Sequence, residues 1–245
     1  MSKKIKWGII STAKIAETDL IPAINKSKNS ELVAIASRSK DKAEKFSKKN
    51  KVKKFYTSYK QLYEDSTIDV IYNPLPNHLH VNSTINAINN NKHVLLEKPI
   101  TLKSKEVDLI KNAASKNKKI VKEAFMVRHH TQWQWIKKYI ESNKIGKVNG
   151  ITTLFSYKNL DPKNIRNIKK FGGGGLWDIG CYAIVISRLL MGKEPKRVVA
   201  EANFDKKFKT DNLATAILDF GGSYANFIVS TCSTVSQQVL ILGSK

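Results

Sequence analysis

The chain has 245 residues, 41% of them apolar, which is enough material for a large core and excludes a disordered or linker protein. No run approaches the ~18 to 20 consecutive apolar residues of a membrane span, and we see no apolar leader with a cleavage site. Two cysteines, Cys181 and Cys232, cannot build a disulfide framework, so we expect a cytoplasmic protein with no membrane partner.

The formal net charge of +23 raises the alternative of a nucleic-acid-binding protein. Only 5 of the 43 basic residues are arginines, the side chains that recognise phosphates and bases best, and the lysines are spread along the chain. We therefore interpret the charge as compositional bias that aids solubility, and we expect no specific nucleic-acid partner.

Strand-like and helix-like segments alternate through the first half of the chain. The predicted strands are 6–10, 31–36, 69–73, 93–97 and 120–125, and the predicted helices are 15–26, 41–50, 79–89 and 104–116. Short apolar strands separated by helices of about ten residues indicate βαβ units and a doubly wound parallel sheet of the Rossmann type. Such a sheet binds its ligand at the carboxyl ends of the strands.

The pattern changes after about residue 147. We expect strands at 148–157, 197–204, 213–220, 223–230 and 237–242, and a helix at 176–191. Gly221-Gly222 is typical of a hairpin turn between two of these strands. The sequence thus predicts an α/β protein whose Rossmann domain, residues 1–125, is followed by an α+β domain, residues 126–245, with a mainly antiparallel open sheet.

The turn after the first predicted strand occupies the position of a dinucleotide fingerprint. Gly-x-Gly-x-x-Gly would place glycines where the chain has Ser11, Ala13 and Ala16, which are small enough for a close approach to a pyrophosphate. An ordinary strand-to-helix turn is the alternative. The candidate cofactor-binding residues here are Gly8, Ser11, Thr12, Ala13, Lys14 and Ile15.

The end of the second predicted strand bears on the choice of cofactor. A carboxylate there would bind the ribose 2′-hydroxyl of NAD, but the chain has Ser37-Arg38-Ser39. An arginine flanked by hydroxyls suits a 2′-phosphate, so we predict NADP, with NAD still possible. A solvated loop arginine is the alternative interpretation.

Three further motifs indicate a family. They are Tyr72-Asn73-Pro74-Leu75-Pro76-Asn77-His78-Leu79-His80, Lys92-His93-Val94-Leu95-Leu96-Glu97-Lys98-Pro99, and Gly172-Gly173-Gly174-Gly175-Leu176-Trp177-Asp178-Ile179-Gly180-Cys181-Tyr182. With these motifs, nearly the whole chain resembles the Gfo/Idh/MocA oxidoreductases, in the branch of NADP-dependent xylose dehydrogenases and dimeric dihydrodiol dehydrogenases. Glu123-Ala124-Phe125-Met126, Arg128, His130 and Asn164-Ile165-Arg166 also match that branch.

The resemblance implies hydride transfer between a nicotinamide and an alcohol carbon of a sugar, polyol or diol. It adds Pro74, Asn77, His80, Glu97 and Lys98 to the expected cofactor-binding residues. It also implies a homo-oligomer that forms through the C-terminal sheet. Members continue beyond the segment 239–243, so we expect this chain to be shortened at its C-terminus, with an incomplete sheet.

Lys98, Tyr182 and Asp178 are the predicted catalytic residues, and together with Arg166 they are the predicted substrate-binding residues. Lys98 follows a predicted strand, where its amine reaches the crevice; the alternative is one more surface lysine. Tyr182 is the predicted general acid/base; its alternative is a packed tyrosine. The two residues Asp178 and Tyr182 share a helix face, although Asp178 could instead cap the helix start.

An alternative function and a possible metal site were also considered from the sequence. A nucleotide-binding sensor without turnover is the alternative function, although the retention of Lys98, Asp178 and Tyr182 argues against it. His129-His130 has no further ligands at suitable spacing, so we expect no metal site.

Overall fold

The computed structural model describes residues 4–245, and the first three residues of the predicted 1–125 domain lie outside the described residues. The chain separates into two compact units, the first ending at Ala124 and the second running from Phe125 to Lys245. Each unit has its own sheet and its own apolar core.

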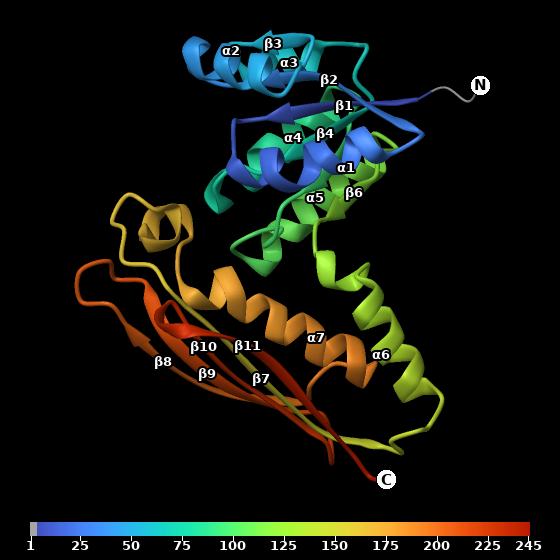
Figure 1. Ribbon diagram of the computed structural model, residues 1–245, viewed down its shortest axis with the longest axis vertical. Coiled ribbons are helices and arrows are strands. Elements are labelled where there is room, and N and C mark those ends of the chain that lie inside the picture. The colour runs from blue at the N-terminus through green and yellow to red at the C-terminus, as the bar shows by residue number, and fades with distance from the viewer. Residues whose placement is uncertain (1–3) are drawn as a thin grey trace. The chain divides into compact units, whose positions relative to one another are not determined.

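The first unit is built on a six-stranded sheet with the order β3-β2-β1-β4-β5-β6 (Figure 1). The strands are β1 Ile5–Ile10, β2 Ser30–Ala36, β3 Lys54–Tyr56, β4 Val70–Asn73, β5 His93–Leu96 and β6 Val121–Glu123. Every neighbouring pair is parallel. The direction of winding reverses between β1 and β4, so a ligand crevice is expected at the carboxyl ends of these strands.

Helices connect these strands and leave apolar side chains buried on both faces of the sheet. The helices are α1 Ile21–Lys26, α2 Lys40–Lys49, α3 Tyr59–Glu64, α4 His80–Asn89 and α5 Ser104–Lys116. Because side chains alternate along a strand, Ile10 and Ala36 join one buried cluster while Ile9 and Ile35 join another. This double burial explains the continuous apolar strands of the sequence.

Two features of the first unit differ from the sequence prediction. The polar stretch that contains β3 and α3 carried no predicted element, because the strand has only three residues and the helix only six. The predicted helix 15–26 divides into a π-helical turn, Ala16–Leu20, and α1. Pro22 stands in the first turn of α1 and has no amide hydrogen to continue a regular ladder.

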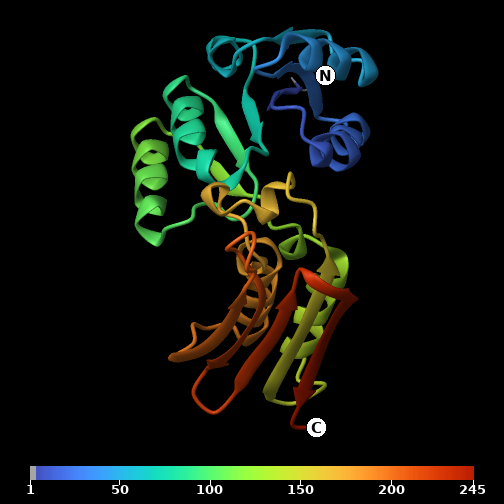
Figure 2. The ribbon, with the colours of Figure 1, turned by 90° about the vertical axis from the view of Figure 1, so that its left-hand side faces the viewer.

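The second unit contains a five-stranded sheet with the order β11-β7-β10-β9-β8, seen side by side in Figure 2. The strands are β7 Val148–Lys158, β8 Arg197–Phe204, β9 Asp211–Asp219, β10 Tyr224–Ser230 and β11 Cys232–Gly243. The β7–β10 pair is parallel and the other pairs are antiparallel, so the sheet is mixed and mainly antiparallel. β11 begins five residues before the predicted strand 237–242, in a polar segment with a register shift.

Two helices accompany this sheet, α6 Thr131–Glu141 and α7 Cys181–Met191. α7 lies along one face (Figure 1) and encloses a core that includes Phe220 and Ile151. The helices predicted from the sequence do not include α6. Apolar side chains on the opposite face of the sheet remain more than half exposed, as Ile217 and Leu240 illustrate.

One helical stretch among the described residues, Lys169–Met191, is long and apolar enough to cross a membrane by length and composition alone. Half of its most apolar window is buried inside the protein, as in the core helix of a soluble domain. Gly172 also interrupts it in a left-handed conformation, before a π-helical turn, Leu176–Gly180, leads into α7. The stretch is therefore weak evidence for a membrane span.

Candidate active site

The turn after β1 has the backbone geometry of a phosphate-binding loop. Ser11 stands at the first glycine position of the fingerprint. It adopts a positive φ of 81°, a conformation that favours glycine. Its backbone N–H donates to the carbonyl of Ala36, and its hydroxyl accepts from the N–H of Ala13 at 3.2 Å. These bonds hold the turn open in front of Lys14 and Ile15, where the following helix begins.

Gly8 stands inside β1 rather than in the loop. A Cβ added there would lie 3.0 Å from the Ile68 side chain and 3.3 Å from the Leu62 side chain. The packing of this face of the sheet therefore explains why residue 8 is small, and we leave Gly8 out of the cofactor contacts that we propose below. Thr12 lies in the loop itself, between Ser11 and Ala13.

The end of β2 borders a cavity of about 550 Å³ in the first unit. Arg38 is exposed and lines this cavity together with Tyr59, Lys60 and Leu75. Ser37 is buried, and its hydroxyl accepts from the N–H of Ser39 at 3.3 Å. A concave site with an exposed arginine at a carboxyl strand end fits an adenosine that carries a 2′-phosphate.

Lys98 lies in the turn directly after β5, at the carboxyl edge of the parallel sheet. The preceding Glu97 accepts a 2.6 Å hydrogen bond from the Tyr72 hydroxyl and a 3.3 Å bond from the Lys98 backbone N–H. Burial raises the pKa of Glu97, while those hydrogen bonds act in the opposite direction. On the far side of the turn, Ile100 donates its N–H to Glu123 at 2.7 Å.

His80 differs from its predicted role. Its ring is fully buried, with Nδ1 2.7 Å from the carbonyl oxygen of Pro99 and Nε2 2.7 Å from that of Leu75. Burial lowers the pKa of His80, and the two carbonyl acceptors oppose that shift. The side chain thus joins the loop after β4 to the turn that carries Lys98, and it has no exposed surface to offer a cofactor. Pro74 and Asn77 lie in that loop, beside Leu75.

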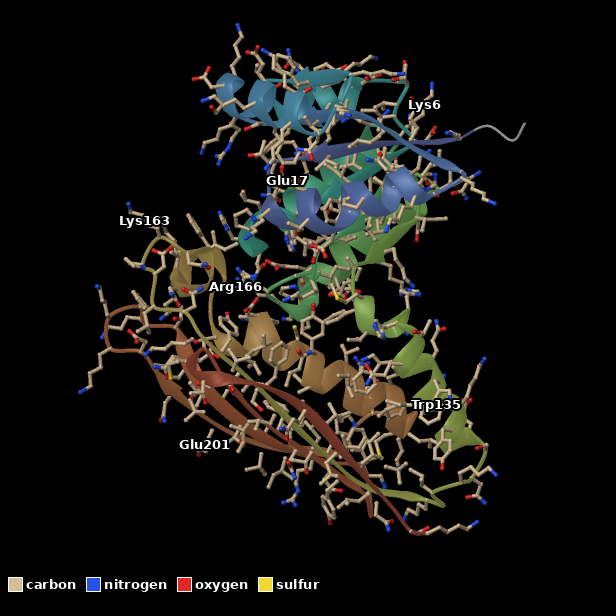
Figure 3. All side chains as sticks on the ribbon, in the orientation of Figure 1. Lys6, Glu17, Trp135, Lys163, Arg166 and Glu201 are labelled. Atoms are coloured by element: carbon tan, nitrogen blue, oxygen red, sulfur yellow. The ribbon has the colours of Figure 1, made fainter. Side chains whose placement is uncertain are left out.

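Three polar side chains meet in the second unit. The Tyr157 hydroxyl, at the end of β7, donates to Oδ2 of Asp178 at 2.5 Å. Nε of Arg166, in the 3₁₀ turn Ile165–Asn167 before α7 (Figure 3), lies 2.9 Å from Oδ1 of Asp178. The Asp178 side chain is only 13% exposed, so this ion pair is shielded from water on the carboxylate side.

The glycine run brings the Arg166 segment against the start of this helical region. A Cβ on Gly173 would lie 2.3 Å from the backbone oxygen of Arg166, and Gly174 donates its N–H to that same oxygen at 2.9 Å. Gly174 has a φ of 126° and faces the Asp211 carboxylate so closely that a Cβ would stand 1.9 Å from Oδ1. Only glycine permits both approaches.

The cap of this helical region comes from a distant strand. Oδ2 of Asp211, at the start of β9, accepts the Leu176 N–H at 2.6 Å. Asp178 was open to interpretation as the cap, but the Leu176 amide is bound by Asp211, and the Asp178 carboxylate binds Tyr157 and Arg166 instead.

Tyr182 occupies the first turn of α7, one helical turn after Asp178. The ring of Phe125 meets it edge-on, with centroids 5.5 Å apart, and Phe155 lies 6.2 Å away. Tyr182 lines a cavity of about 460 Å³ in the second unit, whose other walls include Trp133 and Phe155. The tyrosine is thus both packed and open to a space large enough for part of a small substrate.

The predicted site residues do not include Tyr157, Asp211 or Tyr72. Tyr157 could have been found, because the alternation 151, 153, 155 and 157 places it on the helix-covered face of its strand. Nothing in the sequence signalled Asp211. Among residues 4–245, no group of three or more histidine, cysteine, aspartate or glutamate side chains gathers as metal ligands would.

Comparison with known proteins assigns the chain to a class. Residues 5–125 match an oxidoreductase family with an NAD-binding Rossmann fold, and residues 133–245 match the GFO/IDH/MocA C-terminal domain. The fold and the motifs thus define an oxidoreductase with a dinucleotide-binding sheet and a second open-sheet unit. The chain belongs to the Gfo/Idh/MocA family, which confirms the resemblance and the fold class inferred from the sequence.

Three relatives illustrate the likeness. An uncharacterised oxidoreductase of Rhizobium meliloti is 39% identical over 98% of this chain and 72% of its own length. A D-xylose 1-dehydrogenase (NADP(+)) of Haloferax volcanii is 31% identical over 95% and 71%. KijD10, a 3-ketoreductase from Actinomadura kijaniata solved with NADP and TDP-benzene, is 27% identical, with a TM-score of 0.93 over 99% of this chain and 74% of that one.

Proposed function

We propose that this protein is an NADP-dependent dehydrogenase that acts on a secondary alcohol of a sugar, polyol or diol. The observation that carries the proposal is the position of Lys98, which ends the β5 turn at the carboxyl edge of a Rossmann sheet. Glu97 and Tyr72 on one side, and Pro99 and His80 on the other, hold that turn in place.

NADP is the cofactor that the chain's own residues fit best. Ser11, Thr12 and Ala13 offer an open turn for the pyrophosphate, and Arg38 with the serines beside it offers donors for a 2′-phosphate. When bound, NADP supplies the hydride acceptor for oxidation of the alcohol, or the donor in the reverse direction.

The remaining chemistry falls to residues of the chain. Tyr182 takes the proton from the substrate hydroxyl as the adjacent carbon is oxidised, and Lys98 assists that transfer. Arg166 binds oxygen atoms of the substrate that do not react, and Asp178 holds Arg166 through their ion pair. The two cysteines are unpaired, in keeping with a reducing cytoplasm.

We also propose that two copies of the chain associate through the uncovered face of the second sheet. Apolar side chains such as Ile217, Ile228 and Leu240 stand about half exposed on that face. Exposed apolar side chains on an uncovered sheet face are a feature of many protein interfaces. Equilibrium sedimentation should report a dimer, and a monomer at micromolar concentration would contradict this part of the proposal.

The test of the enzyme proposal replaces Lys98 with Met. Turnover should fall by roughly 10²- to 10⁴-fold, the usual contribution of a proton-transfer group, while the Kd for NADPH, followed by its fluorescence, stays nearly unchanged. Lys105→Met, an exposed lysine at the start of α5, is the matched control and should turn over normally. The substrate panel should span aldoses, polyols and diols with NADP⁺ and NAD⁺.

Three results would count against the enzyme proposal. Retained turnover in Lys98→Met would remove Lys98 from the mechanism. Tight NADPH binding by wild-type protein without turnover on any substrate would favour a nucleotide sensor. Tight, weakly salt-dependent binding to nucleic acid would favour a different class of protein altogether.

A further inference from the structure

The contact between Tyr157 and Asp178 is a tyrosine–carboxylate hydrogen bond close to Tyr182. Tyr157 packs against the apolar cluster that also holds Ile179 and Ala183, so its ring is fixed in place. Its hydroxyl is aimed at Oδ2 of Asp178, at 2.5 Å, from a strand that lies beside the helical region. Hydrogen bonds to a shielded carboxylate are among the stronger ones in proteins.

Tyr157 cannot serve as a base in this arrangement. Burial raises the pKa of the Tyr157 hydroxyl far above its usual value of 10, and the charge of Asp178 raises it further, although Arg166 acts in the opposite direction. The hydroxyl therefore stays protonated and donates to Asp178 over the whole working range of pH. Tyr182, and not Tyr157, therefore stays the proposed group for proton transfer.

Arg166 is held at one edge and open at the other. Asp178 lies 2.9 Å from Nε, while within residues 4–245 neither of the terminal Nη atoms forms a hydrogen bond. Burial lowers the pKa of Arg166, but Asp178, Tyr157 and Tyr182 together raise it more. Arg166 pairs with Asp178, which stands one helical turn before Tyr182, the predicted acid/base.

We propose that Tyr157 is a positioning residue: it fixes the Asp178 carboxylate, which in turn aims the Nη edge of Arg166 at a substrate oxygen next to the reacting carbon. Arg166 is then the group that contacts the substrate, and Asp178 acts by holding it. A planar pair of N–H donors suits the hydroxyl or carbonyl oxygens of a sugar or diol. This inference rests on the proposed function.

The arrangement gives Asp211 and Gly173 each a structural role beside Asp178. Asp211 caps the helical region, which leaves Asp178 for Arg166, and Gly173 lets the Arg166 backbone approach. A positioned arginine binds better than a mobile one because less side-chain entropy is lost on binding.

Tyr157→Phe tests the inference, since it removes the hydroxyl and keeps the ring. The KM for the best alcohol substrate should rise about tenfold, which corresponds to one hydrogen bond to a charged group, while kcat and the Kd for NADPH change little. The same change should have no further effect in an Asp178→Ala background, because Tyr157 acts only through Asp178. Tyr56→Phe removes a similar 2.8 Å bond to Asp65 in the first unit and should leave KM unchanged.

Arg166→Lys supplies a second measurement if Tyr157→Phe folds poorly. Its side chain is 45% exposed, so the protein should tolerate the change, yet lysine has no planar fork to aim. KM should rise while kcat and the Kd for NADPH change little, and an unchanged KM would overturn the inference.

Additive effects of Tyr157→Phe and Asp178→Ala on KM would overturn the inference. So would a fall in kcat at unchanged KM, which would make Tyr157 part of the proton transfer. In both cases wild-type turnover would leave the proposed function standing. Wild-type protein that neither binds NADPH nor turns over an alcohol would overturn both.

Discussion

Gly173 is not part of the cluster of Tyr157, Arg166 and Asp178, but Gly173→Ala should disrupt that cluster by displacing the Arg166 backbone. The new Cβ would stand 2.3 Å from the carbonyl oxygen of Arg166, 2.7 Å from its carbonyl carbon and 2.9 Å from the carbonyl oxygen of Ile165. All three atoms belong to the backbone, so no side chain can rotate to make room. The two segments must separate instead.

The cost follows from that separation. Ordinary van der Waals contact needs a shift of about 1 Å, and overpacking of this kind costs about 1–3 kcal/mol. The shift also breaks the 2.9 Å hydrogen bond from Gly174 to Arg166, worth about 1 kcal/mol. We expect the free energy of unfolding to fall by about 2–4 kcal/mol and the 2.9 Å Arg166–Asp178 ion pair to be lost.

Gly175→Ala is the matched control, two residues further along the same run. Gly175 has helical angles, φ −65° and ψ −36°, and a Cβ there would meet no atom closer than 3.4 Å. An alanine at such a helical position should be neutral or stabilise by up to about 1 kcal/mol.

Urea unfolding followed by tryptophan fluorescence measures both variants, because Trp133, Trp135 and Trp177 all lie in the second unit. Turnover at saturating NADP⁺ reports the active site. If Gly173→Ala unfolds at the wild-type midpoint with wild-type KM, the close approach does not matter and the reasoning is refuted. Equal destabilisation by Gly175→Ala would point to a general effect of the glycine run.

Two further predictions concern the first unit. Arg38→Ala should raise the Kd for NADPH by roughly 10-fold or more, as expected for one lost charge-assisted contact, and leave the Kd for NADH unchanged in fluorescence titrations; equal losses would refute a 2′-phosphate role. Burial raises the pKa of Asp65, but hydrogen bonds from Thr67, Tyr56 and Lys54 bring it down to about 2. A depressed carboxyl pKa stabilises the fold above the unfolded pKa of about 4, so Asp65→Asn should cost about 2 kcal/mol at pH 7, and the difference should shrink as pH falls from about 4 through 2. Denaturant unfolding at pH 7 and pH 3 checks this, and a gap that does not narrow would contradict it.

Much of the first unit could be predicted because the strands of its sheet are buried on both faces. A strand such as β2 must be apolar at successive positions, and Ile35 and Ala36 indeed pack into opposite clusters. The short β3 has Lys54 and Phe55 exposed, so it shows no run of apolar residues by which it could be predicted. α6 was missed although Trp133, Ile136 and Ile140 follow a helical spacing toward the core.

Some residues of the candidate site could likewise be placed from the sequence, and others could not. Lys98 could be placed from the sequence because a residue directly after a parallel strand must emerge at the carboxyl edge. His80 could not, since its burial between the Leu75 and Pro99 carbonyls depends on two loops that only the folded chain brings together.

By itself the sequence determined the class of the protein: a Rossmann sheet with its loop motifs, an open second sheet, and membership of an oxidoreductase family. Local periodicity and short motifs carry that information within a few residues. Only the tertiary structure decided how Asp178 is used. Tyr157 lies 21 residues before it, and Asp211, which caps Leu176, lies 35 residues after Leu176. Contacts between residues this far apart in the sequence arise from tertiary packing, so no local sequence pattern predicts them.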